Sequence, residues 1–125
     1  KPKFKDGYHF SKKMSKEIHY RSGYEKTVYE QLDLWNEVAG YDAEPFEIPY
    51  IHEGKAHKYI PDIVVHYVNG RKEVWEIKPS NQTNLPKNKS KWFAAERACD
   101  NRGWEFVVIT EQGISKLKNK VKLED

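Results

Sequence analysis

Residues 57–79, HKYIPDIVVHYVNGRKEVWEIKP, contain the strongest fold signal in this sequence of 125 residues. Two runs rich in β-branched and aromatic residues, 57–67 and 72–78, flank the dipeptide Asn69-Gly70. Asn-Gly between such runs is a strong signal for a tight hairpin turn, because both residues tolerate the positive φ that this turn needs. The stretch therefore predicts two antiparallel strands that pair directly with each other.

Helical patterns lie on both sides of this hairpin. Ser22, followed three residues later by Glu25, forms a capping box, and apolar residues then recur at helical spacing. A second helix is predicted over residues 90–102, and the apolar run that follows at 104–109 predicts a buried strand. A short last helix is predicted over residues 111–117.

The expected order of elements is α-β-β-β-α-β-α, with a short edge strand at residues 46–48 ahead of the hairpin. A helix between the strand that ends at Lys78 and the strand that begins at Trp104 favours a parallel crossover. We therefore predict an α/β fold with a mixed central sheet flanked by helices.

The chain has the length of a single domain. We place this domain at residues 21–118, between a basic N-terminal arm (1–20) and a C-terminal tail (119–125). The arm mixes lysines with apolar residues without clean periodicity. It is therefore expected to fold either onto the domain or onto a ligand.

Charge is distributed unevenly along the chain. The net charge is +3, and residues 1–21 carry seven Lys or Arg against two acidic residues. Residues 27–54, by contrast, carry seven acidic residues and no Lys or Arg. A basic face presented to a polyanion would give this pattern, and so would an ordinary solvated surface at this modest net charge.

Several classes of protein are excluded by composition. Cys99 is the single cysteine, so the chain can form neither an internal disulfide nor a CxxC zinc pair. No apolar run approaches the ~20 residues that a helix needs to cross a bilayer. We therefore expect a soluble cytoplasmic protein that has no membrane partner.

The candidate chemistry lies on the predicted hairpin. If the chain turns at Asn69-Gly70, Asp62 and Glu76 fall nearly opposite each other, within about 5 Å at Cβ on a shared face. Lys78 follows Glu76 by two residues and points the same way. Paired carboxylates are costly unless a cation neutralises them, and Mg²⁺ takes one or two carboxylates together with water and phosphate oxygens. We therefore predict a Mg²⁺ site beside a lysine that orients or deprotonates water, or stabilises a phosphate transition state.

An alternative is that these are three solvent-facing charges on an amphipathic hairpin. Glu76 and Lys78 follow the apolar pair Val74-Trp75, however, and Pro79 ends the strand. Both charges then lie at the C-terminal end of an apolar strand, which is where sites form in α/β proteins. This placement favours a functional site over a solvated surface.

Pro61-Asp62, a spacer of thirteen residues and then Glu76-Ile77-Lys78 resemble the motif of the PD-(D/E)xK nuclease superfamily, which has the restriction-endonuclease-like fold. The resemblance implies that Asp62 and Glu76 bind Mg²⁺ together with the backbone carbonyl of Ile77, and that Mn²⁺ can substitute. It also implies that Lys78 assists the attacking water. Many members of the superfamily add a glutamate from the first helix. That residue would be Glu25, whose alternative role is to complete the helix cap.

A closer resemblance, to the head-completion nucleases of T-even-type tailed phages, extends over residues 20–117. It is carried by YRSGYEK (20–26), IPY (48–50), EIKP (76–79) and the segments that follow. Those nucleases often have Met-Asp where this chain has Pro-Asp. TnsA-like transposon endonucleases and phage Holliday-junction resolvases share parts of the same pattern.

The resemblance implies a Mg²⁺-dependent DNA endonuclease that acts in phage DNA processing or head completion. No recognition helix with base-reading residues can be identified in the sequence, so we expect cutting that is selective for DNA structure, at branches or ends. A Holliday-junction resolvase or a TnsA-like nuclease is a close alternative. A non-catalytic DNA-binding virion protein on a nuclease fold is an alternative of another class, but such decay normally removes the metal ligands. The expected partners are double-stranded or branched DNA, a second copy of the chain and phage portal or head proteins. The expected location is the host cytoplasm or the virion.

Phosphate contacts are expected from basic residues near this site. Lys91 lies near the start of the predicted second helix, where its charge opposes the helix dipole. A bound phosphate would remove the conflict, and simple solvation is the alternative. The residues expected to hold the DNA backbone are Arg21, Lys58, Lys87, Lys89 and Lys91.

Overall fold

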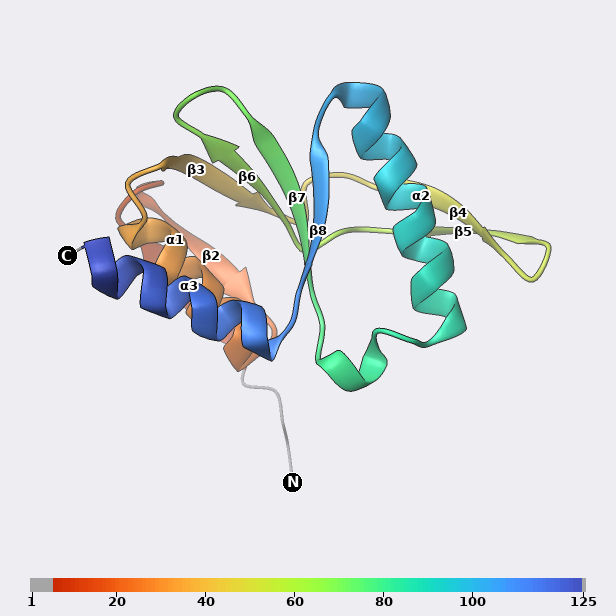
Figure 1. The fold of residues 1–125 in the computed structure, drawn as a ribbon, viewed down its shortest axis with the longest axis horizontal. Coiled ribbons are helices and arrows are strands. Elements are labelled where there is room, and N and C mark those ends of the chain that lie inside the picture. The colour runs from red at the N-terminus through yellow and green to blue at the C-terminus, as the bar shows by residue number, and fades with distance from the viewer. Residues whose placement is uncertain (1–5, 125) are drawn as a thin grey trace.

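A mixed four-stranded sheet forms the centre of the molecule (Figure 1). The computed structural model describes residues 6–124, with side chains through Asn119. The strands run in the order β3-β6-β7-β8, in which only β7 and β8 are parallel. Their bounds are Val38–Ala43 (β3), Ile63–Tyr67 (β6), Lys72–Ile77 (β7) and Glu105–Ile109 (β8). The α/β fold with a mixed central sheet flanked by helices is thereby confirmed.

Helices cover both faces of this sheet. Helices α1 (Gly23–Leu34) and α3 (Glu111–Glu124) pack on one face, and α2 (Pro86–Arg102) packs on the other (Figure 1). Alternate residues of the strands supply the two cores: Ile63 and Trp75 pack toward α1 and α3, whereas Val64 and Val74 pack with Cys99 of α2. Among residues 6–124, no helix is long and apolar enough to cross a membrane.

The predicted hairpin is the pair β6–β7. Ile63 pairs with Trp75 and His66 pairs with Lys72, and Gly70 takes the positive φ of 92° that the turn requires. Helix α2 then crosses over to the parallel strand β8, as expected. It begins at Pro86, four residues before the predicted start, because proline is favoured at the first helical position.

Two further hairpins flank the sheet. One consists of β1 (Gly7–Ser11) and β2 (Lys16–Tyr20), and it packs against α1 (Figure 1). The other consists of β4 (Ile48–His52) and β5 (Lys55–Tyr59), and it packs against α2. The prediction of a single strand over residues 57–67 is therefore wrong. Residues 60–62 are not in strand conformation, and they connect β5 of this two-stranded sheet to β6 of the central sheet.

The described part of the predicted arm folds onto the domain. Ile18 joins the core beside α1, and Lys13 Nζ donates hydrogen bonds to three backbone carbonyls between the last turn of that helix and the start of β3. Residues 1–5 of the arm lie outside the described residues. At the other end, α3 extends through Glu124, so residues 119–124 continue a helix that was expected to end at residue 117.

Strand β3 was not expected from the sequence. Its glycine, Gly40, is buried under Met14, and a Cβ on it would lie 2.8 Å from Met14 Sδ. This close approach explains a glycine inside a strand. The expected edge strand at 46–48 begins only at Ile48, as β4.

Candidate functional site

Strand register brings Asp62 and Glu76 together. Asp62 directly precedes β6, and the pairing of Ile63 with Trp75 places it level with Glu76 on β7. Asp62 Oδ2 accepts a hydrogen bond of 2.6 Å from the backbone N–H of Ile77. The Asp62 side chain is only 13% exposed, so its position is fixed by the sheet and not by solvent.

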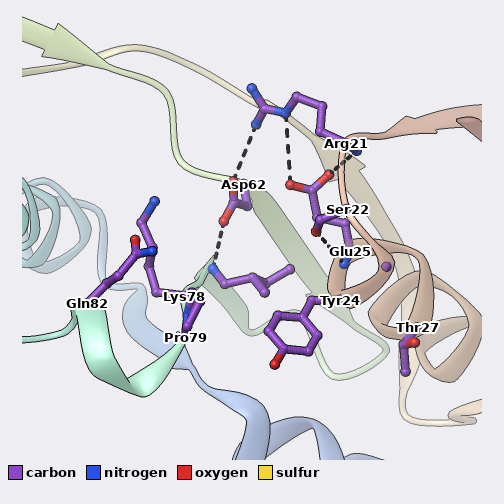
Figure 2. A pocket seen from close by; sticks show the side chains of 11 residues that line it. Arg21, Ser22, Tyr24, Glu25, Thr27, Asp62, Lys78, Pro79 and Gln82 are labelled. Carbon is purple, nitrogen blue, oxygen red and sulfur yellow. Dashed lines mark hydrogen bonds and ion pairs between the residues drawn. The ribbon is translucent and has the colours of Figure 1, made fainter. Parts of the chain in front are cut away.

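Arg21 joins three carboxylates at the edge of the site, of which Figure 2 draws those of Asp62 and Glu25. Its guanidinium lies 3.6 Å from Asp62 Oδ1, 3.3 Å from Glu44 Oε2 and 3.9 Å from Glu25 Oε2. The arginine side chain itself is half exposed. The guanidinium can therefore leave these carboxylates, either when a cation binds them in its place or when an incoming anion binds the arginine.

Glu25 acts as a helix cap in this structure. Ser22 Oγ accepts a hydrogen bond from Glu25 N at 3.2 Å, and Glu25 Oε1 accepts one from Arg21 N at 2.7 Å. The carboxylate therefore reaches back one residue further than in the usual capping box. Glu25 also borders the same cavity as Asp62. That Glu25 also contributes to a metal site stays a prediction.

A cavity of about 1040 Å³ opens between the N-terminal end of α1 and the loop after β7 (Figure 2). Lys78 is half-buried at this cavity, at the C-terminal end of β7. Its backbone N–H donates to the carbonyl of Ile109 on β8, which continues the parallel pairing and fixes the position of the lysine. The lining residues are Arg21, Ser22, Gly23, Tyr24, Glu25, Thr27, Asp62, Ile77, Lys78, Pro79 and Gln82.

Glu76 is buried on the α2 side of the sheet, where it is 4% exposed. Its Oε1 has no hydrogen-bond partner among the described residues. Burial and the charge of Asp62 raise the pKa of Glu76 to about 8, although Lys78, the Trp92 N–H and Lys91 act in the opposite direction. A buried carboxyl group with an unpartnered oxygen is unusual, because such an oxygen normally accepts a hydrogen bond or binds a cation.

The pKa of Asp62 is also raised, to about 6. Burial is the main cause, and the hydrogen bond from Ile77 opposes it. The charge of Glu25 raises this pKa further, while Lys78 and Arg21 lower it. Burial is thus the main cause of both raised pKa values, and the neighbouring cations offset it only in part.

The oxygen donors of this site fit a small divalent cation. Asp62 and Glu76 offer two carboxylates, and the backbone carbonyl of Ile77 lies between Glu76 and Lys78 in the chain. Within residues 6–119, whose side chains the structure describes, no three His, Cys, Asp or Glu side chains lie close enough to share a metal. Two carboxylates with water and substrate oxygens are what Mg²⁺ commonly takes, so this donor set is compatible with it.

The basic residues separate into two groups. Lys91 lies beside the carboxylates: its Nζ is 5.6 Å from the centre of the Tyr59 ring, and the charge of Glu76 acts on it. Burial, and the charge of Lys78, lower the pKa of Lys91. Lys87 lies in the first turn of α2 and adds its charge to that of Lys91.

Lys58 and Lys89 have other surroundings. Lys58 is on β5 and lies 3.9 Å from Glu47 Oε1 in an exposed ion pair. Lys89 borders a separate groove of about 610 Å³ between β4 and α2. Because α2 begins at Pro86, Lys91 lies beyond its first turn, so the predicted conflict with the helix dipole is wrong.

Three residues of the site were not predicted. Glu44 follows β3, and its backbone N–H donates to the carbonyl of Asp62 at 2.9 Å. Tyr59 Oη and Trp92 Nε1 are buried near Glu76 without hydrogen-bond partners in the described chain. The sequence could have indicated Tyr59 and Trp92 only through their residue types. A buried phenol or indole carries a hydrogen-bond donor that needs an acceptor.

Comparison with known proteins agrees with both resemblances inferred from the motifs. Residues 36–111 match the protein family described as TnsA-like endonuclease N terminal. The chain is also similar to the head completion nuclease of Enterobacteria phage T4, with 32% identity over 126 aligned positions that cover 82% of this chain and 84% of that protein. The matched family region contains Asp62, Glu76 and Lys78. The chain therefore belongs to the TnsA-like endonuclease N-terminal family.

Proposed function

We propose that this chain is a metal-dependent DNA endonuclease that hydrolyses phosphodiester bonds at the site formed by Asp62, Glu76 and Lys78. One observation carries the proposal. Glu76 is a buried carboxyl group that is level in the strand register with Asp62, and Asp62 and Lys78 line the same cavity. Membership of an endonuclease family supports the same conclusion.

The carboxylates have a shared role in this proposal. Asp62 and Glu76, with the carbonyl of Ile77, would hold Mg²⁺ or Mn²⁺, which when bound activates water and neutralises charge on the scissile phosphate. The Ile77 N–H keeps Asp62 Oδ2 in place at 2.6 Å, so this carboxylate needs no rearrangement. The raised pKa of both carboxylates follows from burial without a sufficient counter-charge, which a divalent cation would supply.

The lysine and arginine side chains act on the water and the phosphate. Lys78 is half-buried at the cavity, where its ammonium can orient the attacking water or stabilise negative charge that develops on the phosphate oxygens. Arg21 is half exposed and can exchange its three carboxylate contacts for a flanking phosphate. Lys91 supplies a second cation on the α2 side, close to Glu76.

The substrate class follows from this arrangement of charges. Arg21 and Lys78 line an open cavity where they can contact phosphates, and phosphate contacts carry no sequence information, so affinity is expected to depend on salt and little on sequence. We therefore propose cutting that is selective for DNA structure, such as branches or ends. The described residues form one such site, so cutting both strands would need two copies or two encounters.

The biological setting is proposed by similarity. The T4 relative is named as a head completion nuclease, and we propose an equivalent role in phage DNA processing, in the host cytoplasm or in the virion, beside head or portal proteins.

A cleavage assay tests the proposal. Supercoiled plasmid and a four-way junction are incubated with the protein in Mg²⁺, Mn²⁺ or EDTA, alongside Asp62→Ala. We expect cutting by the wild type in either metal, and none in EDTA or with the variant. Binding of DNA without cutting in both metals would instead support a non-catalytic DNA-binding protein on a nuclease fold.

A further inference from the structure

Three buried side-chain polar atoms lack a hydrogen-bond partner within the described residues: Glu76 Oε1, Tyr59 Oη and Trp92 Nε1. They come from three separate elements, since Glu76 is on β7, Tyr59 ends β5 and Trp92 is on α2. Buried polar atoms are nearly always hydrogen-bonded in folded proteins, because burial removes their hydrogen bonds to water. Three exceptions in one small domain call for a common explanation.

These three atoms belong to one neighbourhood. Tyr59 and Trp92 pack in the same apolar cluster between the β4–β5 hairpin and α2. The charges of Glu76 and Asp62 act on the Tyr59 hydroxyl, and the Trp92 N–H acts on the Glu76 carboxylate. Lys91 belongs to the same neighbourhood, because its Nζ lies 5.6 Å from the centre of the Tyr59 ring and the charge of Glu76 acts on it.

The chemistry of the three groups is complementary. Glu76 Oε1 is an acceptor, and the Tyr59 O–H and Trp92 N–H are donors. None of the three makes a hydrogen bond of ordinary geometry with another, but each becomes satisfied if the carboxylate turns toward the donors or if one water joins them. Either arrangement fixes one oxygen of Glu76 and leaves the other free.

We propose that Tyr59 and Trp92 are positioning residues that hold Glu76 Oε1, directly or through one water, so that the second oxygen is presented to the metal. This inference rests on the proposed function. Hydrogen bonds to the far oxygen of a ligating carboxylate fix its orientation, and losing such a partner typically weakens metal binding 10- to 100-fold. Neither residue needs to contact the substrate.

The experiment measures metal binding by the full chain without DNA. Free Mn²⁺ is followed by electron paramagnetic resonance during titration of wild type, Tyr59→Phe and Trp92→Phe, and thermal melting of each is recorded in EDTA. We expect the Mn²⁺ dissociation constant to rise about tenfold or more in Tyr59→Phe and in Trp92→Phe. A purely structural role would lower the melting temperature and leave the dissociation constant unchanged.

Tyr67→Phe is the matched control. Tyr67 is 7% exposed and Tyr59 is 8% exposed, but the Tyr67 hydroxyl donates to Glu73 Oε1 at 2.8 Å, nearer the turn of the hairpin. Its removal should leave the Mn²⁺ dissociation constant unchanged. Wild-type affinity, within about twofold, in both Tyr59→Phe and Trp92→Phe would overturn the inference.

The same titration separates this inference from the proposed function. Asp62→Ala should abolish Mn²⁺ binding. If the wild type binds no Mn²⁺, or if Asp62→Ala binds it normally, the proposed metal site fails and the inference fails with it. If Asp62→Ala loses binding and the two aromatic variants do not, only the inference fails.

Discussion

Asp62 and Ile77 are joined by a hydrogen bond of 2.6 Å, in which the backbone N–H at the end of β7 donates to the carboxylate that precedes β6. This bond occupies Oδ2, while Oδ1 faces the half-exposed guanidinium of Arg21 at 3.6 Å. One oxygen is therefore held by the sheet, and the other is held by a side chain that can move away. Such an aspartate can exchange its counter-ion without moving its own backbone.

Removing either carboxylate tests this arrangement. We expect Asp62→Ala and Glu76→Gln each to abolish cleavage, because each loses a proposed metal ligand. DNA binding should stay intact or become tighter, since negative charge near the phosphate is removed. The measurements are single-turnover cleavage in Mg²⁺ and a gel-shift titration. Glu73→Gln on the same strand is the control, and wild-type rates in Asp62→Ala or Glu76→Gln would contradict the assignment.

Stability of the metal-free protein should depend on pH through Glu76. Its folded-state pKa of about 8 lies above its ordinary value of 4.5 because the site is buried and adjoins Asp62. The folded state therefore binds the proton more tightly than the unfolded state, and the free energy of unfolding falls as pH rises between these two values. The raised pKa of Asp62 acts in the same direction at lower pH.

Thermal melting in EDTA from pH 5 to pH 8.5 measures this dependence. We expect the melting temperature of the wild type to fall across this range and that of Glu76→Gln to fall less, because glutamine does not ionise. Added Mg²⁺ should raise the wild-type melting temperature most at the alkaline end, where the carboxylates are ionised. Parallel pH profiles for the two proteins would show that Glu76 is not the titrating group.

Lys13 is predicted to stabilise the fold and not the site. Its Nζ donates to the carbonyls of Leu32, Trp35 and Val38 at 2.8, 2.7 and 2.6 Å, where α1 ends. Burial lowers the pKa of Lys13, but the ammonium still supplies a charged donor to three carbonyls between the last turn of α1 and the start of β3. We expect Lys13→Met to lower the free energy of unfolding by about 2 kcal/mol, the scale of hydrogen bonds to a charged group.

Urea unfolding measures this loss, and Lys12→Met at the exposed neighbouring position is the control. Equal stability of the two variants would mean that the carbonyl contacts contribute nothing. The same contacts explain why residues 7–20 cannot be treated as a removable arm, since their deletion would also take Ile18 out of the core.

The relationship between Asp62 and Glu76 could be predicted because it depends on a short stretch of sequence. The dipeptide Asn69-Gly70 sets the turn, the turn sets the register, and the register determines which residues are opposite each other. Nothing distant in the sequence is needed for that step.

The hairpin β1–β2 and the strand β3 depend instead on contacts between distant residues. Asp33 on α1 accepts hydrogen bonds from Ser11 on β1 at 2.7 Å and from Tyr41 on β3 at 3.0 Å. Its other oxygen lies 2.7 Å from His9 Nε2. A polar centre of this kind adds no apolar periodicity to β1 or β3, so sequence patterns could not reveal these strands.

The unpartnered donors of Tyr59 and Trp92 could not be predicted from the sequence for a different reason. Sequence patterns place aromatic residues in a core, and both are indeed packed in one. Whether a phenol O–H or an indole N–H lacks a partner depends on how β5, β7 and α2 meet, which is a property of the assembled fold.

Lys78 provides the most specific test of the proposed chemistry, because its two possible roles differ in charge and in reach. If it only stabilises negative charge in the transition state, Lys78→Arg should retain measurable activity. If it positions or deprotonates the water, arginine is a poor substitute, since it is always protonated and presents a planar fork instead of a compact ammonium.

We expect both Lys78→Arg and Lys78→Ala to lose on the order of 10²-fold or more in rate, the scale of general acid–base catalysis or of an oxyanion-type contact. Metal binding should survive in Lys78→Ala, because the amine is not a proposed ligand. Single-turnover cleavage at saturating Mn²⁺, with calorimetric metal titration, measures both effects. Lys116→Ala, an exposed position on α3, is the control. If Lys78→Ala cuts within about threefold of the wild type, the ammonium has no part in the reaction, and water activation at this site must be assigned to other groups.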